Sequence, residues 1–161
     1  MHPSVAPLHR TLRLNTRLYL NCLEGVDDDA ARRRPDARTN SIGFIALHLV
    51  DSRHFLARML GVEAHHPFSA LLDAVRGIDE LREVPPLAAV RAAWIEVSAL
   101  LEGRLEALTD DELAREPGQR FFPDDPTLLG ALTFLAQHDG YHVGQMSLLR
   151  KWAGLDAMSY A

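Results

Sequence analysis

Cysteine is nearly absent from this chain. Cys22 is the only one among 161 residues, so no disulfide can form within the chain. Stability must therefore come from the packing of apolar side chains or from a bound ion, and the protein does not need an oxidising compartment. A hydrophobic content of 47% over this length suits one well-developed core and is too little for two, which predicts a single domain over residues 1–161.

A concentrated basic surface is also missing. The chain carries 17 basic and 22 acidic residues, for a net charge of -5, and the two signs are interspersed. A face that binds nucleic acid needs clustered positive charge, so this balance argues against nucleic acid as a partner. The run of arginines at 32–34 is too short to change that conclusion, and we interpret it as a solvated connection ended by Pro35.

Long apolar runs are absent too. The N-terminal segment lacks the apolar stretch after a basic start that marks a secretory signal. No part of the chain approaches the length of uninterrupted apolar sequence that crosses a bilayer. We therefore expect a soluble, cytoplasmic protein with no membrane partner.

Apolar residues recur at helical spacing in four long segments, whereas no alternating strand pattern and no internal repeat is found. The predicted helices are residues 5–25, the stretch from Ile42 to Gly61, the stretch from Leu87 to Leu108, and residues 126–152. Each segment has one apolar face, and four such faces are all buried only if the helices pack together. The sequence thus predicts an all-α fold, a four-helix bundle with short extra helices in its connections.

Capping residues refine these boundaries. Asp125 followed by Pro126 predicts an N-cap and a first helical position, which places the start of the last long helix there. Residues 109–112 have the S/T-x-x-E form of a capping box and predict a short helix after the third long one. In the connection 61–86 the spacing of four apolar residues allows another short helix; these are Leu72, Val75, Ile78 and Leu81.

Histidines lie on the inward faces of two predicted helices. His138 and His142 are one helical turn apart on the apolar face of the last helix. His48 lies on the same side of the second helix as Ile45 and Leu49. Imidazoles in an apolar interior need partners, because burying a polar group without one costs about 1–3 kcal/mol. Histidines at i and i+4 with a third from another helix can share one divalent ion and leave coordination positions open, as in catalytic zinc sites.

The simpler interpretation of each histidine is a hydrogen-bonded core residue, and it stands beside the metal hypothesis. For the other histidines it is the one we adopt. They lie near the N-terminus, off the apolar stripe of the second helix, or in the loop before Pro67, and they are His2, His9, His54, His65 and His66.

Three polar residues next to the histidines are candidate partners of a ligand nitrogen or of bound water. Asp51 lies three residues after His48, Gln145 three after His142, and Asp139 directly after His138. Asp139 makes the string HDGYH similar to the metalloprotease motif H-E-x-x-H, but aspartate is one methylene short for the role of base. Packing or solvent exposure is the alternative for all three. Phe121 and Phe122, before the last helix, are candidates to cover the mouth of the site or to pack in the core.

Two segments carry a family resemblance. The strings NSIGFIALHLVDSRHFLARML and LTFLAQHDGYHVGQMSLLRKWAG are similar to the signature segments of the DinB-like (YfiT-like, damage-inducible) metalloprotein superfamily, which is unrelated to the DNA polymerase of the same name. The resemblance implies a four-helix bundle in which His48, His138 and His142 bind a divalent ion, with waters completing the shell. It also implies a homodimer. The ion expected is zinc or nickel, with iron or manganese as alternatives, because imidazole ligands select weakly among these metals.

The resemblance further implies thiol chemistry, since members of known activity transfer low-molecular-weight thiols such as bacillithiol or catalyse mycothiol-dependent isomerisation. Our first hypothesis is therefore a metal-dependent thiol S-transferase or related enzyme, whose small-molecule thiol and electrophile come from outside because Cys22 lies in a helix without ligands. A hydrolase that uses water as the nucleophile is its variant. The alternatives are a non-catalytic module that binds metal or a small ligand in a stress response, and a metal-free bundle used for dimerisation.

Overall fold

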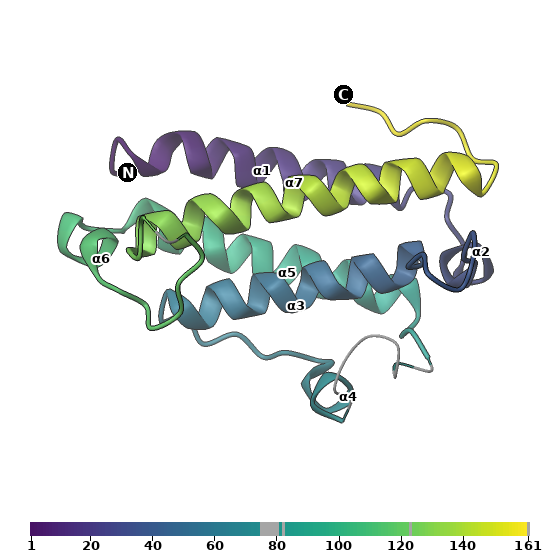
Figure 1. Cartoon of the computed structure of the whole chain (residues 1–161), viewed down its shortest axis with the longest axis horizontal. Helices are drawn as coiled ribbons and strands as arrows, with labels where there is room; N and C mark the ends of the chain where they lie inside the picture. The colour runs from purple at the N-terminus through teal and green to yellow at the C-terminus, as the bar shows by residue number, and fades with distance from the viewer. Residues whose placement is uncertain (75–80, 82, 123, 161) are drawn as a thin grey trace.

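The computed structural model of the chain describes residues 1–74, 81, 83–122 and 124–160. Every regular element in these ranges is an α-helix (Figure 1). The four long helices are α1 (Val5–Cys22), α3 (Ile42–Met59), α5 (Leu87–Glu106) and α7 (Leu128–Trp152). Short helices lie in the connections: α2 (Asp28–Arg32), α4 (Ser69–Asp73) and α6 (Asp110–Ala114). The predicted all-α four-helix bundle is thereby confirmed.

The start of α7 differs from the prediction. The N-cap is Thr127, whose hydroxyl accepts a hydrogen bond from the backbone N–H of Gly130 at 3.2 Å. Asp125 Oδ1 accepts hydrogen bonds from the backbone N–H and the hydroxyl of Thr127, at 3.1 and 2.6 Å. The aspartate therefore holds the capping residue instead of capping the helix itself. A Cβ at position 130 would lie 2.6 Å from the carbonyl oxygen of Asp125, so this tight turn requires glycine.

The end of α1 also differs from the prediction by a few residues. Helix α1 ends at Cys22 and not at residue 25, because the chain turns through Gly25, whose φ is +72°. The connection that follows contains α2, which the sequence analysis missed. Its N-cap Asp27 accepts a hydrogen bond from the N–H of Ala30 at 2.7 Å. Five residues are too few for a periodic apolar pattern to be recognised, and the arginines at 32–34 are exposed as predicted.

Of the two short helices predicted in the connections, one is confirmed and the other agrees with the structure only in part. The capping box before α6 is confirmed, with reciprocal hydrogen bonds between Thr109 and Glu112. In the connection between α3 and α5, Leu72 lies in α4, whereas Leu81 lies outside any helix. The remaining two residues of that prediction, Val75 and Ile78, lie outside the described residues.

The long helices form two parallel pairs (Figure 1). Helices α1 and α7 run in the same direction, since Asn15 bonds to Ala136 and, further along both helices, Cys22 approaches Val143. Helices α3 and α5 run the opposite way, and the guanidinium of Arg104 near the end of α5 donates to the carbonyl of Leu60 just after α3, at 2.9 Å. The chain must therefore return along the length of α3, about 27 Å for its 18 residues, before α5 begins. This return explains the long connection that carries α4.

Buried apolar side chains form two groups, one toward each end of the bundle. One group includes Tyr19 and Trp94, whose rings stack with centroids 4.1 Å apart, and it joins the second half of α1 to the first half of α3. The other group joins the first half of α1 to the second half of α3 and includes Leu12 and Leu56. Between the two groups, the helices bring polar residues to the interior, and the candidate site lies at this level.

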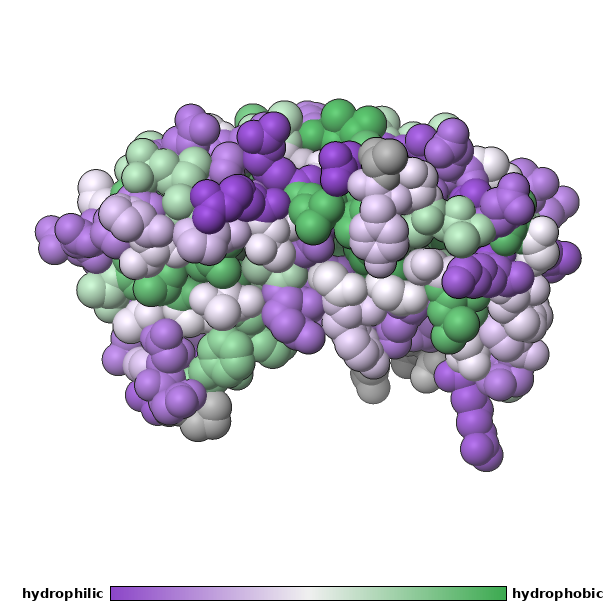
Figure 2. All heavy atoms as spheres, turned by 90° about the horizontal axis from the view of Figure 1, so that it is seen from above, coloured by the Kyte–Doolittle hydropathy of each residue, from purple (hydrophilic) through white to green (hydrophobic). Residues whose placement is uncertain are grey.

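The outer surface is mixed in character. On the face drawn in Figure 2, hydrophobic residues form small patches separated by hydrophilic ones. Among the described residues, no helix combines the length and the apolar character that crossing a membrane requires.

Candidate metal centre

Helix α3 places His48 on the seam between α3 and α7. The helix starts at Ser41, whose hydroxyl accepts a hydrogen bond from the backbone N–H of Phe44 at 3.2 Å. From that start, Ile45 and Leu49 point into the core and are almost completely buried. His48 lies beside them but is only half-buried, so its ring reaches the edge of the seam.

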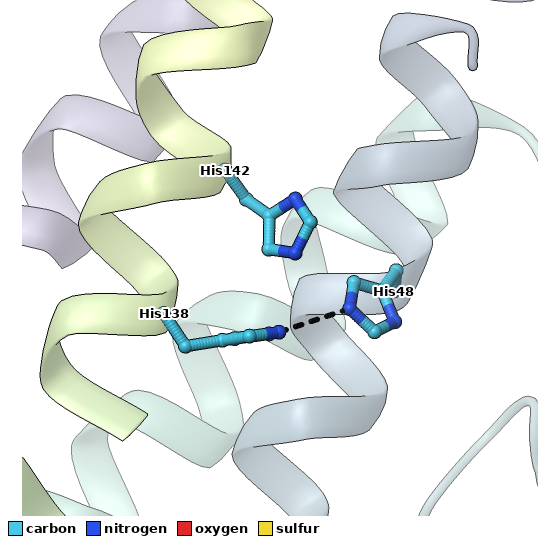
Figure 3. A group of neighbouring side chains, drawn as sticks. All are labelled: His48, His138 and His142. Atoms are coloured by element: carbon cyan, nitrogen blue, oxygen red, sulfur yellow. Dashed lines mark hydrogen bonds between the residues drawn. The ribbon is translucent and has the colours of Figure 1, made fainter. Parts of the chain in front are cut away.

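Helix α7 supplies the other two histidines of the site. His138 and His142 are one turn apart and point toward His48 (Figure 3). Each of the three residues offers one ligand atom, and these atoms lie within 4.8 Å of one another. The Nε2 atoms of His48 and His138 are 3.1 Å apart. The structure thus brings together the three histidines that the sequence analysis selected.

Burial favours the neutral form of two of these rings. The pKa of His138 is lowered to about 4 by burial and, to a lesser extent, by the neighbouring His142 and His48. The pKa of His48 is lowered by burial and by His142, while Asp51 opposes the shift. Both rings are therefore neutral at physiological pH, and each has one nitrogen lone pair to offer. A metal ion requires this form of imidazole.

Side chains one turn away orient the rings. Gln145 Oε1 lies 2.7 Å from His142 Nδ1, so this nitrogen carries the proton and donates to the amide oxygen. His138 Nδ1 lies 3.5 Å from the hydroxyl oxygen of Ser52. These contacts leave Nε2 of both rings as the atom that faces the shared space. Partners of this kind fix ring orientation and tautomer in metal sites.

The donor set fits a divalent ion. Two neutral rings whose Nε2 lone pairs face each other at 3.1 Å repel unless a cation or a proton lies between them. Zinc–nitrogen bonds of about 2.0–2.1 Å in a tetrahedral arrangement place two ligand nitrogens about 3.3 Å apart, close to the observed separation. Three imidazoles also leave at least one coordination position for another ligand.

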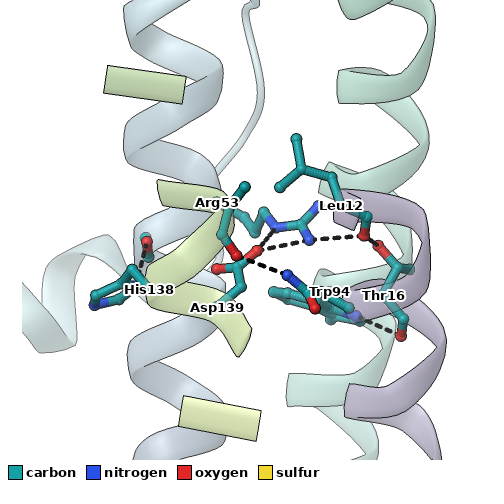
Figure 4. Close-up of polar contacts among 9 residues, drawn as sticks. Leu12, Thr16, Arg53, Trp94, His138 and Asp139 are labelled. Carbon is teal, nitrogen blue, oxygen red and sulfur yellow. Dashed lines mark hydrogen bonds and ion pairs between the residues drawn. The ribbon is translucent and has the colours of Figure 1, made fainter. Parts of the chain in front are cut away.

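The three predicted polar neighbours have different positions. Gln145 contacts His142, as described above. Asp51 points to His66, whose Nε2 donates to Asp51 Oδ1 at 3.1 Å, and this hydrogen bond lowers the pKa of the carboxyl group. Asp139 points away from His138 (Figure 4), and a surface position for it is ruled out because it is 1% exposed. Ser52 was not selected from the sequence, although its position four residues after His48 places it on the same helix face.

Asp139 forms a buried ion pair with Arg53. Its Oδ2 atom lies 2.7 Å from both Nε and a terminal nitrogen of the guanidinium. The same guanidinium donates to the carbonyl of Leu12 on α1 at 3.2 Å and lies over the Trp94 ring of α5 at 4.4 Å. One arginine of α3 thus contacts the three other long helices, at the level of the histidines (Figure 4). Burial raises the pKa of Asp139, and Arg53 opposes this shift.

Several histidines that we left without a role are buried. The rings of His54 and His66 stack with centroids 4.2 Å apart, and they are 3% and 8% exposed. Both ring nitrogens of His54 face carbonyl oxygens, those of Val50 and His65. His9, near the N-terminus, is also buried. His54 lies off the apolar stripe of α3. It is buried because the segment after α3, which contains His65 and His66, packs on a second face of that helix.

Comparisons with known proteins agree with this architecture. The chain is similar to a DinB-like protein from Bacillus cereus, with 19% identity, coverage of 94% of each chain and a TM-score of 0.71. It is similar to YfiT from Bacillus subtilis, with 18% identity, coverage of 97% of this chain and 91% of YfiT, and a TM-score of 0.69. YfiT is described as a probable metal-dependent hydrolase with an unusual four-helix bundle topology. No match is found among curated proteins. The sequence model of the DinB superfamily matches residues 11–146, and the chain therefore belongs to the DinB superfamily.

Proposed function

We propose that this chain is a divalent-metal-dependent enzyme whose ion is held by Nε2 of His48, His138 and His142. The observation that carries the proposal is the approach of the Nε2 atoms of His48 and His138 to 3.1 Å, with the ligand atom of His142 within 4.8 Å. Three protein ligands on an otherwise open ion are typical of catalytic sites, whereas structural zinc sites have four. The description of YfiT as a probable metal-dependent hydrolase supports the same class for this chain.

An ion in such a site acts as a Lewis acid and lowers the pKa of a thiol or a water molecule bound to it. The residues of the chain supply the orientation. Gln145 holds the Nδ1 proton of His142, and Ser52 faces Nδ1 of His138. The buried pair of Arg53 and Asp139 holds α3 and α7 together at this level.

Two reaction classes fit this chemistry. The first class is the transfer of a thiol of the bacillithiol or mycothiol type to an electrophile. This more specific proposal comes from the family resemblance. Cys22 cannot supply the thiol, since it is fully buried and burial raises its pKa to about 11. Hydrolysis is the second class, favoured by the description of YfiT. Zinc or nickel is the proposed ion, with iron or manganese as alternatives.

Metal content tests the site first. We expect elemental analysis of the untagged protein to find close to one divalent ion per chain, and His142→Ala to lose it. His65→Ala is the matched control, because His65 is exposed and its side chain lies outside the cluster. If metal-free wild-type protein takes up none of zinc, nickel, iron and manganese on titration, the proposed metal site is wrong. The metal-free bundle is then the hypothesis that remains.

Turnover tests the enzyme. The metal-loaded protein is assayed with bacillithiol or mycothiol and a panel of electrophiles, and in parallel with esters and amides without thiol. We expect one of the two arms to show turnover that His142→Ala loses and His65→Ala keeps. A metal-loaded protein inactive in both arms would support the non-catalytic binding module instead.

The homodimer is also a proposal. It comes from the family resemblance, and light scattering on the purified chain tests it. A monomer at micromolar concentration would contradict it without affecting the metal site.

A further inference from the structure

Four phenylalanine side chains lie together on the His138 side of the candidate metal centre. They come from α3, from the loop before α7 and from α7 itself, and we call them the phenylalanine cluster: Phe55, Phe121, Phe122 and Phe134. The centroid separations are 6.1 Å between Phe55 and Phe121, 4.9 Å between Phe121 and Phe134, and 5.8 Å between Phe122 and Phe134. The rings therefore form one continuous apolar group.

This group reaches the candidate ligands. The ring of Phe134 lies nearly parallel to that of His138, with an interplanar angle of 27° and centroids 6.1 Å apart. Phe134 and His138 are one turn apart on α7, so the helix itself places the apolar group beside a proposed ligand. The two loop residues that the sequence analysis considered as a cover for the site pack against Phe134.

The cluster remains partly open to solvent. All four side chains are half-buried, whereas the core leucines of α3 and α7 are almost completely covered. Phe55, Phe121 and Phe134 pack on the edge of the second core group, which accounts for the buried part of these side chains. The part that remains accessible to solvent lies beside the candidate metal centre. Apolar side chains accessible at the edge of a reactive site are typical of ligand recognition.

Both polar and aromatic groups flank the rest of the centre. Gln145 contacts His142. Single aromatic rings lie beside the other two ligands: the ring centroids of Phe44 and His48 are 6.3 Å apart, and those of Tyr141 and His142 are 5.1 Å apart. The phenylalanine cluster adds a group of four adjoining rings, so a ligand at the ion meets hydrogen-bonding groups and an extended apolar group. This combination suits a molecule with a polar head and an apolar body.

We propose that the phenylalanine cluster is the apolar subsite of the metal centre, and that the substrate is a small molecule whose aromatic ring packs there while its polar group reaches the ion. The inference depends on the proposed metal-dependent function. Aromatic rings favour offset-stacked or edge-to-face contacts with other rings, and the cluster offers ring faces and edges for both.

Paired metal chelators test the subsite. Acetohydroxamate and benzohydroxamate carry the same metal-binding head group, and only the second has an aromatic ring. Their affinities are measured by calorimetry on the zinc-loaded protein, for the wild type and for Phe122→Ala and Phe134→Leu. Comparing the affinity ratio between variants cancels the intrinsic difference in chelation between the two compounds.

We expect the wild type to prefer benzohydroxamate, and each variant to lose a large part of this preference, roughly fivefold to tenfold, while acetohydroxamate affinity stays unchanged. The control is Ile95→Ala, which removes an exposed apolar side chain from α5, in the groove toward α1. It should preserve both affinities. Phe122 lies outside the helices, so Phe122→Ala carries the test even if Phe134→Leu fails to fold.

An affinity ratio that is the same in the wild type and in Phe122→Ala would overturn the subsite and leave the metal proposal intact. If neither hydroxamate binds and elemental analysis finds no metal, the proposed function fails and the subsite fails with it.

Discussion

Asp139→Asn removes the negative charge from a buried ion pair and leaves the shape of the side chain nearly unchanged. The side chains of Arg53 and Asp139 are 3% and 1% exposed, so solvent cannot compensate the guanidinium that remains. Removing one partner of a buried pair costs about 3–5 kcal/mol. A domain of this kind is stable by about 5–15 kcal/mol in total, so the substitution removes a large share of the free energy of unfolding.

The assay is chemical and thermal unfolding followed by circular dichroism. For a chain of this length, about 2–4 °C of melting temperature is lost per kcal/mol, so Asp139→Asn should lower it by roughly 6–20 °C. The matched control is Glu102→Gln, which removes the partner of Arg13 from an exposed pair of 3.0 Å. An exposed pair contributes about 0–1 kcal/mol, and the control should stay within that range.

A double variant separates charge from packing. Arg53→Met combined with Asp139→Leu replaces the pair by apolar side chains, and such replacements are often neutral or stabilising. We expect it to recover most of the stability that Asp139→Asn loses. If Asp139→Asn costs less than about 1 kcal/mol, or if the double variant is less stable than the single one, the role assigned to this pair is wrong.

Three further predictions concern single residues. Gln145→Ala should weaken metal affinity about 10- to 100-fold in a chelator competition, because it frees the ligand ring it now orients. Cys22 should resist thiol reagents in the native protein at about pH 8 and react on denaturation, since burial raises its pKa to about 11. The pKa of Glu112 is lowered to about 2 by the backbone N–H of Thr109 and by Arg104, so wild-type protein should be more stable than Glu112→Gln above about pH 4.5 and lose this advantage as the pH falls toward 2.

Each of these has a result that counts against it. Unchanged chelator competition in Gln145→Ala would mean that the amide does not orient the ligand. Rapid labelling of Cys22 in folded protein would mean that the packing around it opens readily. A stability difference for Glu112→Gln that persists at pH 2 would show that the carboxylate charge is not its cause.

Local sequence determined the helices and the inward direction of the proposed ligands. Apolar spacing along α3 and α7 places His48, His138 and His142 on faces that must be buried, because a helix repeats its faces every three to four residues. The capping box at Thr109 was equally local, since its two hydrogen bonds join residues three apart. Helix faces and caps depend on residues a few positions apart, so the sequence is enough to predict them.

Tertiary structure alone decided which residues these faces meet. Asp139 was expected near the ligands or at the surface, but its partner Arg53 lies 86 residues away in the sequence, and no local pattern shows that pairing. The burial of His54 and His66 depends on the return segment that two parallel helices, α3 and α5, require. The phenylalanine cluster likewise forms only when three separate segments converge. Contacts between distant residues arise from the packing of whole helices, so helical periodicity could indicate a metal site and its neighbour Gln145, but not the contacts that come from other helices and loops.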